Sequence, residues 1–198
     1  MGERAGPQVE PIPNEPAATA DLDGERLLLL ADYHAGIEAG LRYERGVELP
    51  DNARERRDRL CELLDRTDAD RLVVLGDLGH RIGSPGEAER AELAALYAAV
   101  VDERGVPITV ASGNHDGDLA AAVGDRAGVD VLDAAGGLLG EPPAALGVLH
   151  GHTWPAPELS AAATICLGHE HPQVNLTDSV GGSRTERAWL RGRLDSDI

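Results

Sequence analysis

Histidine is the residue type whose placement first suggests chemistry in this sequence. The chain of 198 residues contains seven histidines, and each follows an apolar stretch within a short segment that also contains Gly or Asp. They are His34, His80, His115, His150, His152, His169 and His171. Core packing does not explain why histidines recur in such segments. The distribution indicates a shared site, and imidazole is a common ligand of transition metals.

Oxygen donors accompany these histidines. Asp32 and His34 are two residues apart where an apolar run opens into a polar loop, so both side chains can be directed at one point. Asp77 follows a glycine, and residues 113–116 supply an amide, an imidazole and a carboxylate. Each segment alone has an ordinary explanation, because Gly-Asp closes many strands and Gly-Asn-His-Asp can form a turn. Together, these nitrogen and oxygen donors favour Mn²⁺, Fe, Zn²⁺, Ni²⁺ or Co²⁺ over Ca²⁺ or Mg²⁺.

Five segments in a fixed order carry a family resemblance. ADYH, LGDLGH, SGNHD, LHGH and LGHEHP resemble the motif blocks of the calcineurin-like metallophosphoesterase superfamily, across about residues 26–194. The finer pattern has GDLGH in place of GDxxD and ends with AWLRGRL, and in this it is similar to the archaeal and bacterial ICC-like, or ligase-associated, phosphoesterases. With the acidic composition, that branch suggests a haloarchaeal source.

The resemblance implies a site with two divalent transition-metal ions, with Mn²⁺ as the first expectation. One ion would be held by Asp32, His34, Asp77 and His171, and the other by Asp77, Asn114, His150 and His169. His115 would be the acid that assists the leaving oxygen, and Asp116 would orient it. His80 and His152 lie outside this scheme and are expected to form hydrogen bonds that orient the metal ligands, while Arg81 is a candidate for substrate contact.

The expected reaction is hydrolysis of a phosphomonoester or phosphodiester by a metal-bridging hydroxide, since two adjacent ions lower the pKa of a bound water and hold the phosphoryl oxygens. Two alternatives remain open. A DNA-repair nuclease would need a basic channel for phosphates, which a formal net charge of −17 does not support. A protein-binding scaffold with the same fold would not need the catalytic residues, so the intact His115 argues against it.

Apolar patterns predict the elements that position these residues. Strands are expected at RLLLLAD ending at Asp32, at RLVVLGD ending at Asp77 and over residues 106–111, with a polar loop from Asp32 to about Pro50. Helices are expected over residues 51–66, 84–104 and 118–123, the second introduced by a capping box at Ser84. Shorter strands are expected at 129–132, 144–149, 164–167, 173–176 and 187–193. This order predicts an α/β fold with two mixed sheets flanked by helices, a four-layer α-β-β-α sandwich.

Composition sets the wider expectations. Residues 1–22 predict a flexible acidic leader, followed by a single metallophosphoesterase domain over residues 23–198. The 35 acidic residues outnumber the 18 basic ones, which are all arginine. This composition suggests a halophilic protein, because molar salt screens the repulsion between the excess carboxylates. Cys61 and Cys166 have no CxxC partner and are expected to be buried thiols. The chain is expected to be cytoplasmic, with no membrane partner and with a homodimer as one possible assembly.

Overall fold

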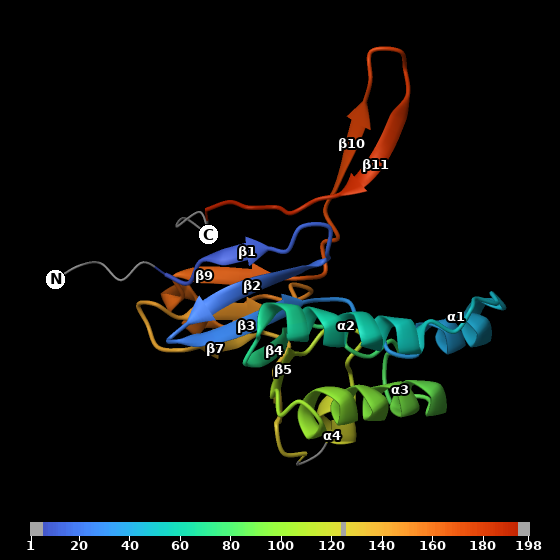
Figure 1. Cartoon of the computed structure of the whole chain (residues 1–198), viewed down its shortest axis with the longest axis horizontal. Helices are drawn as coiled ribbons and strands as arrows, with labels where there is room; N and C mark the ends of the chain where they lie inside the picture. The colour runs from blue at the N-terminus through green and yellow to red at the C-terminus, as the bar shows by residue number, and fades with distance from the viewer. Residues whose placement is uncertain (1–5, 124–125, 194–198) are drawn as a thin grey trace.

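A six-stranded sheet forms the centre of the molecule (Figure 1). The structure, a computed structural model, describes residues 6–123 and 126–193. The strands lie side by side in sequence order: β1 (Val9–Pro11), β2 (Ala17–Leu22), β3 (Glu25–Leu30), β4 (Arg71–Val74), β5 (Ile108–Ala111) and β6 (Val129–Leu132). The first three are antiparallel neighbours and β3 to β6 are parallel. The carboxyl ends of β3, β4, β5 and β6 therefore meet at one edge of the sheet.

The segment expected to be a flexible leader is part of this sheet, so that prediction was wrong for residues 6–22. β2 pairs with β3 in antiparallel register along its whole length, and its buried alanines are Ala17, Ala18 and Ala20. Asp23 and Gly24 form the connecting loop with φ of 52° and 88°, the conformation that Asp-Gly favours in two-residue hairpins. The domain thus begins before residue 23, while residues 1–5 lie outside the described residues.

Helices cover one face of the central sheet (Figure 1). In the described ranges the α-helices are α1 (Ile37–Arg45), α2 (Ala53–Thr67), α3 (Glu87–Tyr97) and α4 (Leu119–Val123). The chain steps from β3 through β4 and β5 to β6 in one direction, and right-handed crossovers in one direction place all the connecting helices on the same face. None of the described helices has the length and apolarity required to cross a lipid bilayer.

Helix boundaries depart from the sequence predictions in two places. α1 occupies part of the stretch expected to be a polar loop up to Pro50. α3 begins at Glu87 with Gly86 as its N-cap, because the Glu89 carboxylate accepts a hydrogen bond from the Gly86 N–H, so the expected cap at Ser84 was wrong. The helix then continues as the π-helical turn η1 (Ala98–Asp102) before Gly105.

Two cores lie on opposite faces of the central sheet because neighbouring strand residues point in opposite directions. Leu28 of β3 packs in the core that includes Leu64 of α2. Leu27, its neighbour, packs in a second core that includes Leu146, a residue of a second sheet that is described below. The near-continuous apolar run of β3 is therefore explained by burial on both faces.

A second, three-stranded sheet packs against the face that has no helices. It consists of β7 (Gly137–Leu139), β8 (Leu146–Leu149) and β9 (Thr164–Leu167), with β8 and β9 parallel. Leu146 and Val148 of β8 point into the shared core, so Gly147 points outward, towards Leu159 of the 3₁₀ helix η2 (Pro157–Ala161). The predicted α/β fold with two mixed sheets is confirmed, but in the described ranges η2 stands where an outer α-helical layer was expected.

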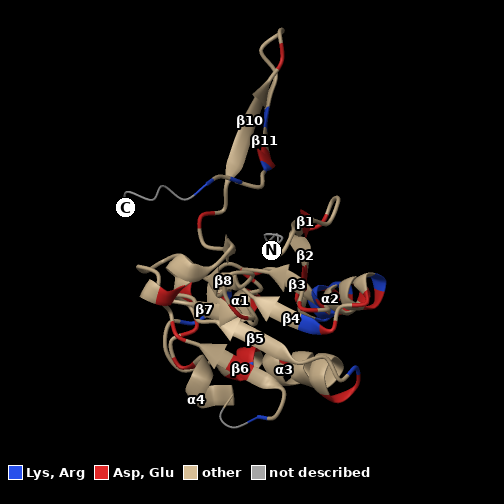
Figure 2. Cartoon of the chain, turned by 90° about the vertical axis from the view of Figure 1, so that its left-hand side faces the viewer, with Lys and Arg blue, Asp and Glu red and all other residues tan. Residues whose placement is uncertain are grey.

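A hairpin of β10 (Gln173–Thr177) and β11 (Ser183–Arg187) extends away from the body of the molecule in both views (Figures 1 and 2). The predicted strand over 187–193 was wrong, because β11 ends at Arg187 and residues 188–193 form no strand. Those residues return towards β1, where the Arg191 guanidinium donates a hydrogen bond to the Val9 carbonyl. Cys61 of α2 is buried and Cys166 of β9 is half-buried, and both are free thiols.

Candidate active site

The predicted site residues follow the carboxyl ends of strands from both sheets. Asp32 comes after β3, Asp77 after β4, and Asn114 after β5. His150 and His169 come after β8 and β9 of the second sheet. The structure brings these strand ends together, because the Asn114 amide oxygen lies 3.1 Å from His150 Nε2, and His169 Nδ1 lies 3.2 Å from the same nitrogen.

Several of these residues have a left-handed backbone conformation that is unusual for residues other than glycine. The positive φ values belong to Asp32 (57°), His34 (52°), Asp77 (54°), His169 (66°) and His171 (41°). Such conformations cost about 1–3 kcal/mol each and persist where the surrounding structure imposes them. Here the imposing contacts include main-chain hydrogen bonds from Asp32 N to Gly76 O (3.0 Å) and from His34 N to Asp77 O (2.9 Å). The loop after β3 is therefore joined to the loop after β4.

Two glycines allow these loops to approach closely. A Cβ on Gly113 would overlap Oδ1 and the backbone nitrogen of Asp77. A Cβ on Gly76, which has φ of 85°, would overlap the ring of His150. The glycines of the Gly-Asp and Gly-Asn segments are thus required by contact as well as by backbone conformation.

Asp77 lies between two sets of imidazoles. Its Oδ1 accepts a hydrogen bond from the backbone N–H of His115 at 2.9 Å. Its Oδ2 lies 3.4 Å from Nε2 of His150 and 3.9 Å from Nε2 of His34. Burial disfavours the charged carboxylate, but hydrogen bonds from His150 and the His115 backbone outweigh it and lower the pKa of Asp77 to about 2. One oxygen is therefore held by the backbone while the other faces both histidines.

Asp32, Asp77 and His150 form the first of two groups whose ligand atoms lie within 4.8 Å of one another. The His150 side chain is fully buried, and its Nδ1 donates to the Leu75 carbonyl at 2.8 Å, which leaves Nε2 as the atom that faces the group. Burial opposes the protonated ring, but the hydrogen bond to Asp77 and the Leu75 carbonyl raise the pKa of His150. A carbonyl that fixes the tautomer in this way is typical of metal-binding histidines.

Asp32 supplies an independent test of whether this group suits a metal. Its Oδ1 is buried and has no hydrogen-bond partner among the described residues, although His171 Nε2 lies 3.4 Å away. A buried carboxylate oxygen without a partner is unfavourable unless a cation or water satisfies it. Together with the Asn114 amide and the His169 imidazole, which both lie beside His150 Nε2, these carboxylates and His150 form a donor set that fits a divalent transition metal.

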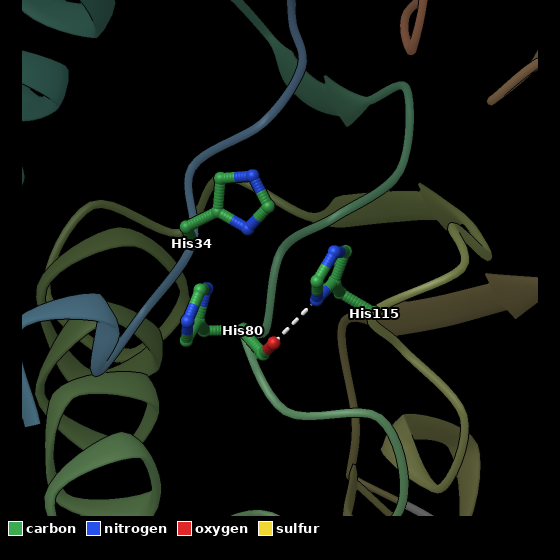
Figure 3. Close-up of side chains that lie close together, drawn as sticks. All are labelled: His34, His80 and His115. Atoms are coloured by element: carbon green, nitrogen blue, oxygen red, sulfur yellow. Dashed lines mark hydrogen bonds between the residues drawn. The ribbon is translucent and has the colours of Figure 1, made fainter. Parts of the chain in front are cut away.

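His34, His80 and His115 form the second group (Figure 3). The His34 ring meets the other two edge-on, with centroids 5.3 Å from His80 and 5.1 Å from His115, while His80 and His115 are stacked at 5.4 Å. Burial lowers the pKa of His34, and burial followed by repulsion from His34 and His115 lowers the pKa of His80. This group is half-buried and consists only of imidazoles.

Comparison with known proteins identifies the family of the chain. The model of the calcineurin-like phosphoesterase family matches residues 25–178, which contain every residue of both groups. The chain belongs to the calcineurin-like phosphoesterase family. The fold is also similar to the crystal structure of Pseudomonas putida nuclease MPE, with 22% identity, a TM-score of 0.49, and coverage of 89% of this chain and 79% of that one. No curated protein matches the sequence.

Asp116 does not orient His115 as the sequence predicted. Its Oδ1 accepts a hydrogen bond from Gly79 N at 2.8 Å and its Oδ2 accepts one from Gly113 N at 2.9 Å, so the carboxylate ties the loops after β4 and β5 together. Nδ1 of His115 instead bonds the main-chain carbonyl of His80 (Figure 3). The orientation of His115 thus comes from the backbone.

The remaining predicted residues contribute less through their side chains. Nδ1 of His80 and Nδ1 of His152 are buried without hydrogen-bond partners among the described residues, so these nitrogens do not make the expected hydrogen bonds to metal ligands. His80 acts instead through its carbonyl, and the His152 ring lies 5.4 Å from that of His150. Arg81 is exposed, and its guanidinium lies beside Gly86 at the start of α3 rather than against either group.

Sequence reasoning missed the buried charges that support the ligand loops. Glu89 Oε1 accepts hydrogen bonds from His80 N at 2.9 Å and Arg81 N at 3.4 Å, and Glu92 Oε2 accepts one from Gly36 N at 2.7 Å. Arg56 of α2 bonds Glu92 and also Glu38 of α1. The capping-box position of Glu89 was a usable signal, whereas nothing local marks the Arg56 contacts.

Proposed function

We propose that this chain is a dinuclear phosphoesterase in which Asp77 is the ligand shared by two divalent ions. The observation that carries the proposal is the position of Asp77 Oδ2, which lies 3.4 Å from His150 Nε2 on one side and 3.9 Å from His34 Nε2 on the other. A carboxylate with a pKa of about 2 stays charged at every physiological pH, as a bridging ligand must.

The ligand sets divide on either side of Asp77. One ion would be held by Asp32, His34, Asp77 and His171, and the other by Asp77, Asn114, His150 and His169. In support of the first set, His171 Nε2 lies 3.4 Å from Asp32 Oδ1. In support of the second, the Asn114 amide oxygen and His169 Nδ1 both lie within hydrogen-bond distance of His150 Nε2. Mixed oxygen and imidazole donors suit Mn²⁺, with Fe, Zn²⁺, Ni²⁺ and Co²⁺ as alternatives.

Such ions supply Lewis acidity towards phosphoryl oxygens and lower the pKa of a bound water. The chain's own contribution to proton transfer is His115. Its Nδ1 is engaged by the His80 carbonyl, so Nε2 is the ring atom available to carry a proton to the leaving oxygen. Asp116 keeps the two loops that carry Asp77 and His115 at a fixed separation.

The experiment is a substrate panel with Mn²⁺, in low salt and in molar salt, with and without a chelator. Nitrophenyl phosphate and bis(nitrophenyl) phosphate separate monoesterase from diesterase activity, and single-stranded and duplex DNA test the nuclease alternative. We expect hydrolysis of at least one nitrophenyl substrate, abolished by the chelator and reduced in His115→Ala. Tight metal binding without hydrolysis of any substrate would instead favour a protein-binding scaffold.

Metal binding itself is measured separately by thermal unfolding. Ions that bind only the folded chain raise the midpoint of unfolding, and ions at about 100 times their dissociation constant add about 2.7 kcal/mol. We expect Mn²⁺ to raise the midpoint of the wild-type chain and to raise that of Asp77→Asn far less. An equal shift in both chains would place the ions elsewhere and contradict the proposed centre.

A further inference from the structure

The β10–β11 hairpin is an unusually isolated part of the molecule. All ten residues of its two strands are exposed, and it forms a sheet separate from the other two. Both views show it extending away from the body (Figures 1 and 2). A two-stranded hairpin without a covered face is marginally stable in water, and more strands or a packed face make it stable. The hairpin also carries exposed apolar side chains, Val174 and Leu176.

The main-chain groups of β11 that point away from β10 can be identified from the ends of the hairpin. Ala188 N donates to Pro172 O at 2.9 Å, and Asp178 N donates to Gly182 O at 2.9 Å. Hydrogen-bonded pairs in an antiparallel ladder occur at every second residue, so the even-numbered residues bond within the hairpin. The N–H and C=O groups of Ser183, Thr185 and Arg187 consequently point outward and form an edge that no other strand of the described residues pairs with.

The charged side chains of β11 are complementary to those of a second, antiparallel β11 strand. Arg184 and Glu186 lie on one face of β11, and their atoms Nε and Oε1 are 3.2 Å apart. If two β11 strands pair antiparallel about Thr185, each Arg184 lies directly opposite the Glu186 of the other strand. Oppositely charged residues directly across an antiparallel pair stabilise it, and like charges destabilise it. The outward groups of Thr185 then bond those of the second Thr185.

We propose that two copies of the chain associate through antiparallel pairing of their β11 strands, which joins the two hairpins into one four-stranded sheet. This contact is isologous, so the same residues serve both copies and the assembly closes as a dimer. Val174 pairs with Glu186 and Leu176 with Arg184 inside each hairpin, so the apolar residues of both copies share the face that carries the charge pairs.

β11 is favoured over the other open edge because β10 has no charged side chain and therefore no charge complementarity. The projection of the hairpin also favours pairing through β11. Each chain has a formal net charge of −17, so the bodies of two chains repel each other. Contact at the end of a projecting arm keeps the acidic bodies apart. At physiological ionic strength the Debye length is about 8 Å, so this longer-range repulsion is screened while contacting pairs are screened less.

The decisive test uses charge reversal and mixing, read by size-exclusion chromatography with light scattering at physiological ionic strength. We expect the wild-type chain to be a dimer and Arg184→Glu and Glu186→Arg each to weaken association by at least about tenfold, because each places like charges opposite one another. An equimolar mixture of the two variants should form a heterodimer, since every opposing pair is again oppositely charged. The Arg184–Glu186 contact within each chain stays broken in both variants, so recovery on mixing can come only from pairing between chains.

Two further variants complete the experiment. Thr185→Pro removes an outward N–H without removing a ladder bond inside the hairpin, and it should give a monomer. Arg54→Glu reverses an exposed charge on α2 and should remain dimeric. A wild-type chain that stays monomeric at millimolar concentration, or a mixture of the two variants that stays monomeric, overturns the proposal. Persistence of the dimer in both charge variants also overturns it, in favour of a different contact. Hydrolysis of nitrophenyl substrates is measured in parallel, so failure of the dimer is distinguishable from failure of the proposed function.

Discussion

The two side-chain groups beside Asp77 are built from different chemistry. Asp32, Asp77 and His150 combine two carboxylates with a fully buried imidazole whose pKa is raised. The second group combines three half-buried imidazoles, of which His34 and His80 have lowered pKa values. The unpartnered Oδ1 of Asp32 favours a bound cation. Burial and mutual repulsion lower the pKa values of His34 and His80 and so favour their neutral rings, the form in which imidazole binds a metal. In the proposed mechanism the first group mainly binds the ions, and the second contributes both a ligand, His34, and the proton donor, His115.

Replacing Asp77 should have the largest effect, because it faces both groups. In Asp77→Asn the amide keeps the shape but removes the charge that would offset the ions. Residues that only support ligands already change metal affinity by about 10–100-fold, so loss of the shared carboxylate should exceed 100-fold in affinity and activity. Metal content by mass spectrometry and the rate with nitrophenyl phosphate would measure both effects.

Asp130→Asn is the matched control, since Asp130 is an exposed carboxylate of β6. It should leave metal content and rate unchanged. If Asp77→Asn retained two ions per chain, the distinction between the two groups would lose its basis.

Replacing His115 should separate proton transfer from metal binding. General acid catalysis contributes about 10²–10⁴-fold, so His115→Ala should lower kcat by that factor while the metal content stays at the wild-type value. A substrate with a leaving group of low pKa needs less protonation, so the loss should be smaller with nitrophenyl phosphate than with an alkyl phosphate. Loss of metal in this variant would make His115 a ligand instead of an acid.

The ligands were predictable from the sequence because each follows a short apolar run. Strands such as LVV before Gly76 are marked by local composition, and parallel strands bring their carboxyl ends together. The Asp23-Gly24 turn was an available signal that residues 17–22 form a strand, but alanine gives little apolar contrast there. α1 was hidden for a similar reason, since its buried residues are Glu38 and Gly40 rather than apolar ones.

The support of the site could not be predicted in the same way, because it depends on contacts between distant segments. Arg56 sits on α2 among other arginines that are mostly solvent-exposed, and nothing in its neighbours distinguishes it. Its partners lie 18 and 36 residues away. His115 is oriented by the main-chain carbonyl of His80 and not by Asp116. A motif of side chains gives no information about where a main-chain carbonyl lies, so this contact could not be predicted either.

Arg56 tests whether this support stabilises the loop that carries Asp32 and His34. Its guanidinium lies 2.8 Å from Glu38 and 2.9 Å from Glu92, both largely buried. Removing one partner of a buried ion pair leaves uncompensated charge, so Arg56→Ala should lower the free energy of unfolding by about 3 kcal/mol. Arg54→Ala, two residues away and exposed, should change it by less than about 1 kcal/mol. Urea unfolding of the metal-free chains would measure both.

The same network predicts a pH dependence. The hydrogen bond from Arg56 lowers the pKa of Glu38 below its usual value despite partial burial. The folded pKa lies below the unfolded one of about 4.3, so this stabilisation is complete above that pH and is lost as the pH falls through the folded pKa. The difference in stability between wild type and Arg56→Ala should therefore be constant near neutral pH and shrink in acid. A difference that grew in acid would contradict the assignment.

Replacing the His80 ring should have the smallest effect, although His80 belongs to the second group by distance. The main-chain carbonyl of His80 contacts His115, and the main-chain N–H of His80 donates to Glu89. Alanine at this position therefore retains both interactions. The ring's Nδ1 has no hydrogen-bond partner among the described residues. We expect His80→Ala to keep its metal content and to lower kcat by less than about tenfold, well below the range expected for a lost general acid. A fall in metal content comparable to that of Asp77→Asn would show instead that the three imidazoles bind an ion together, and the two groups would then differ in ligand type rather than in role.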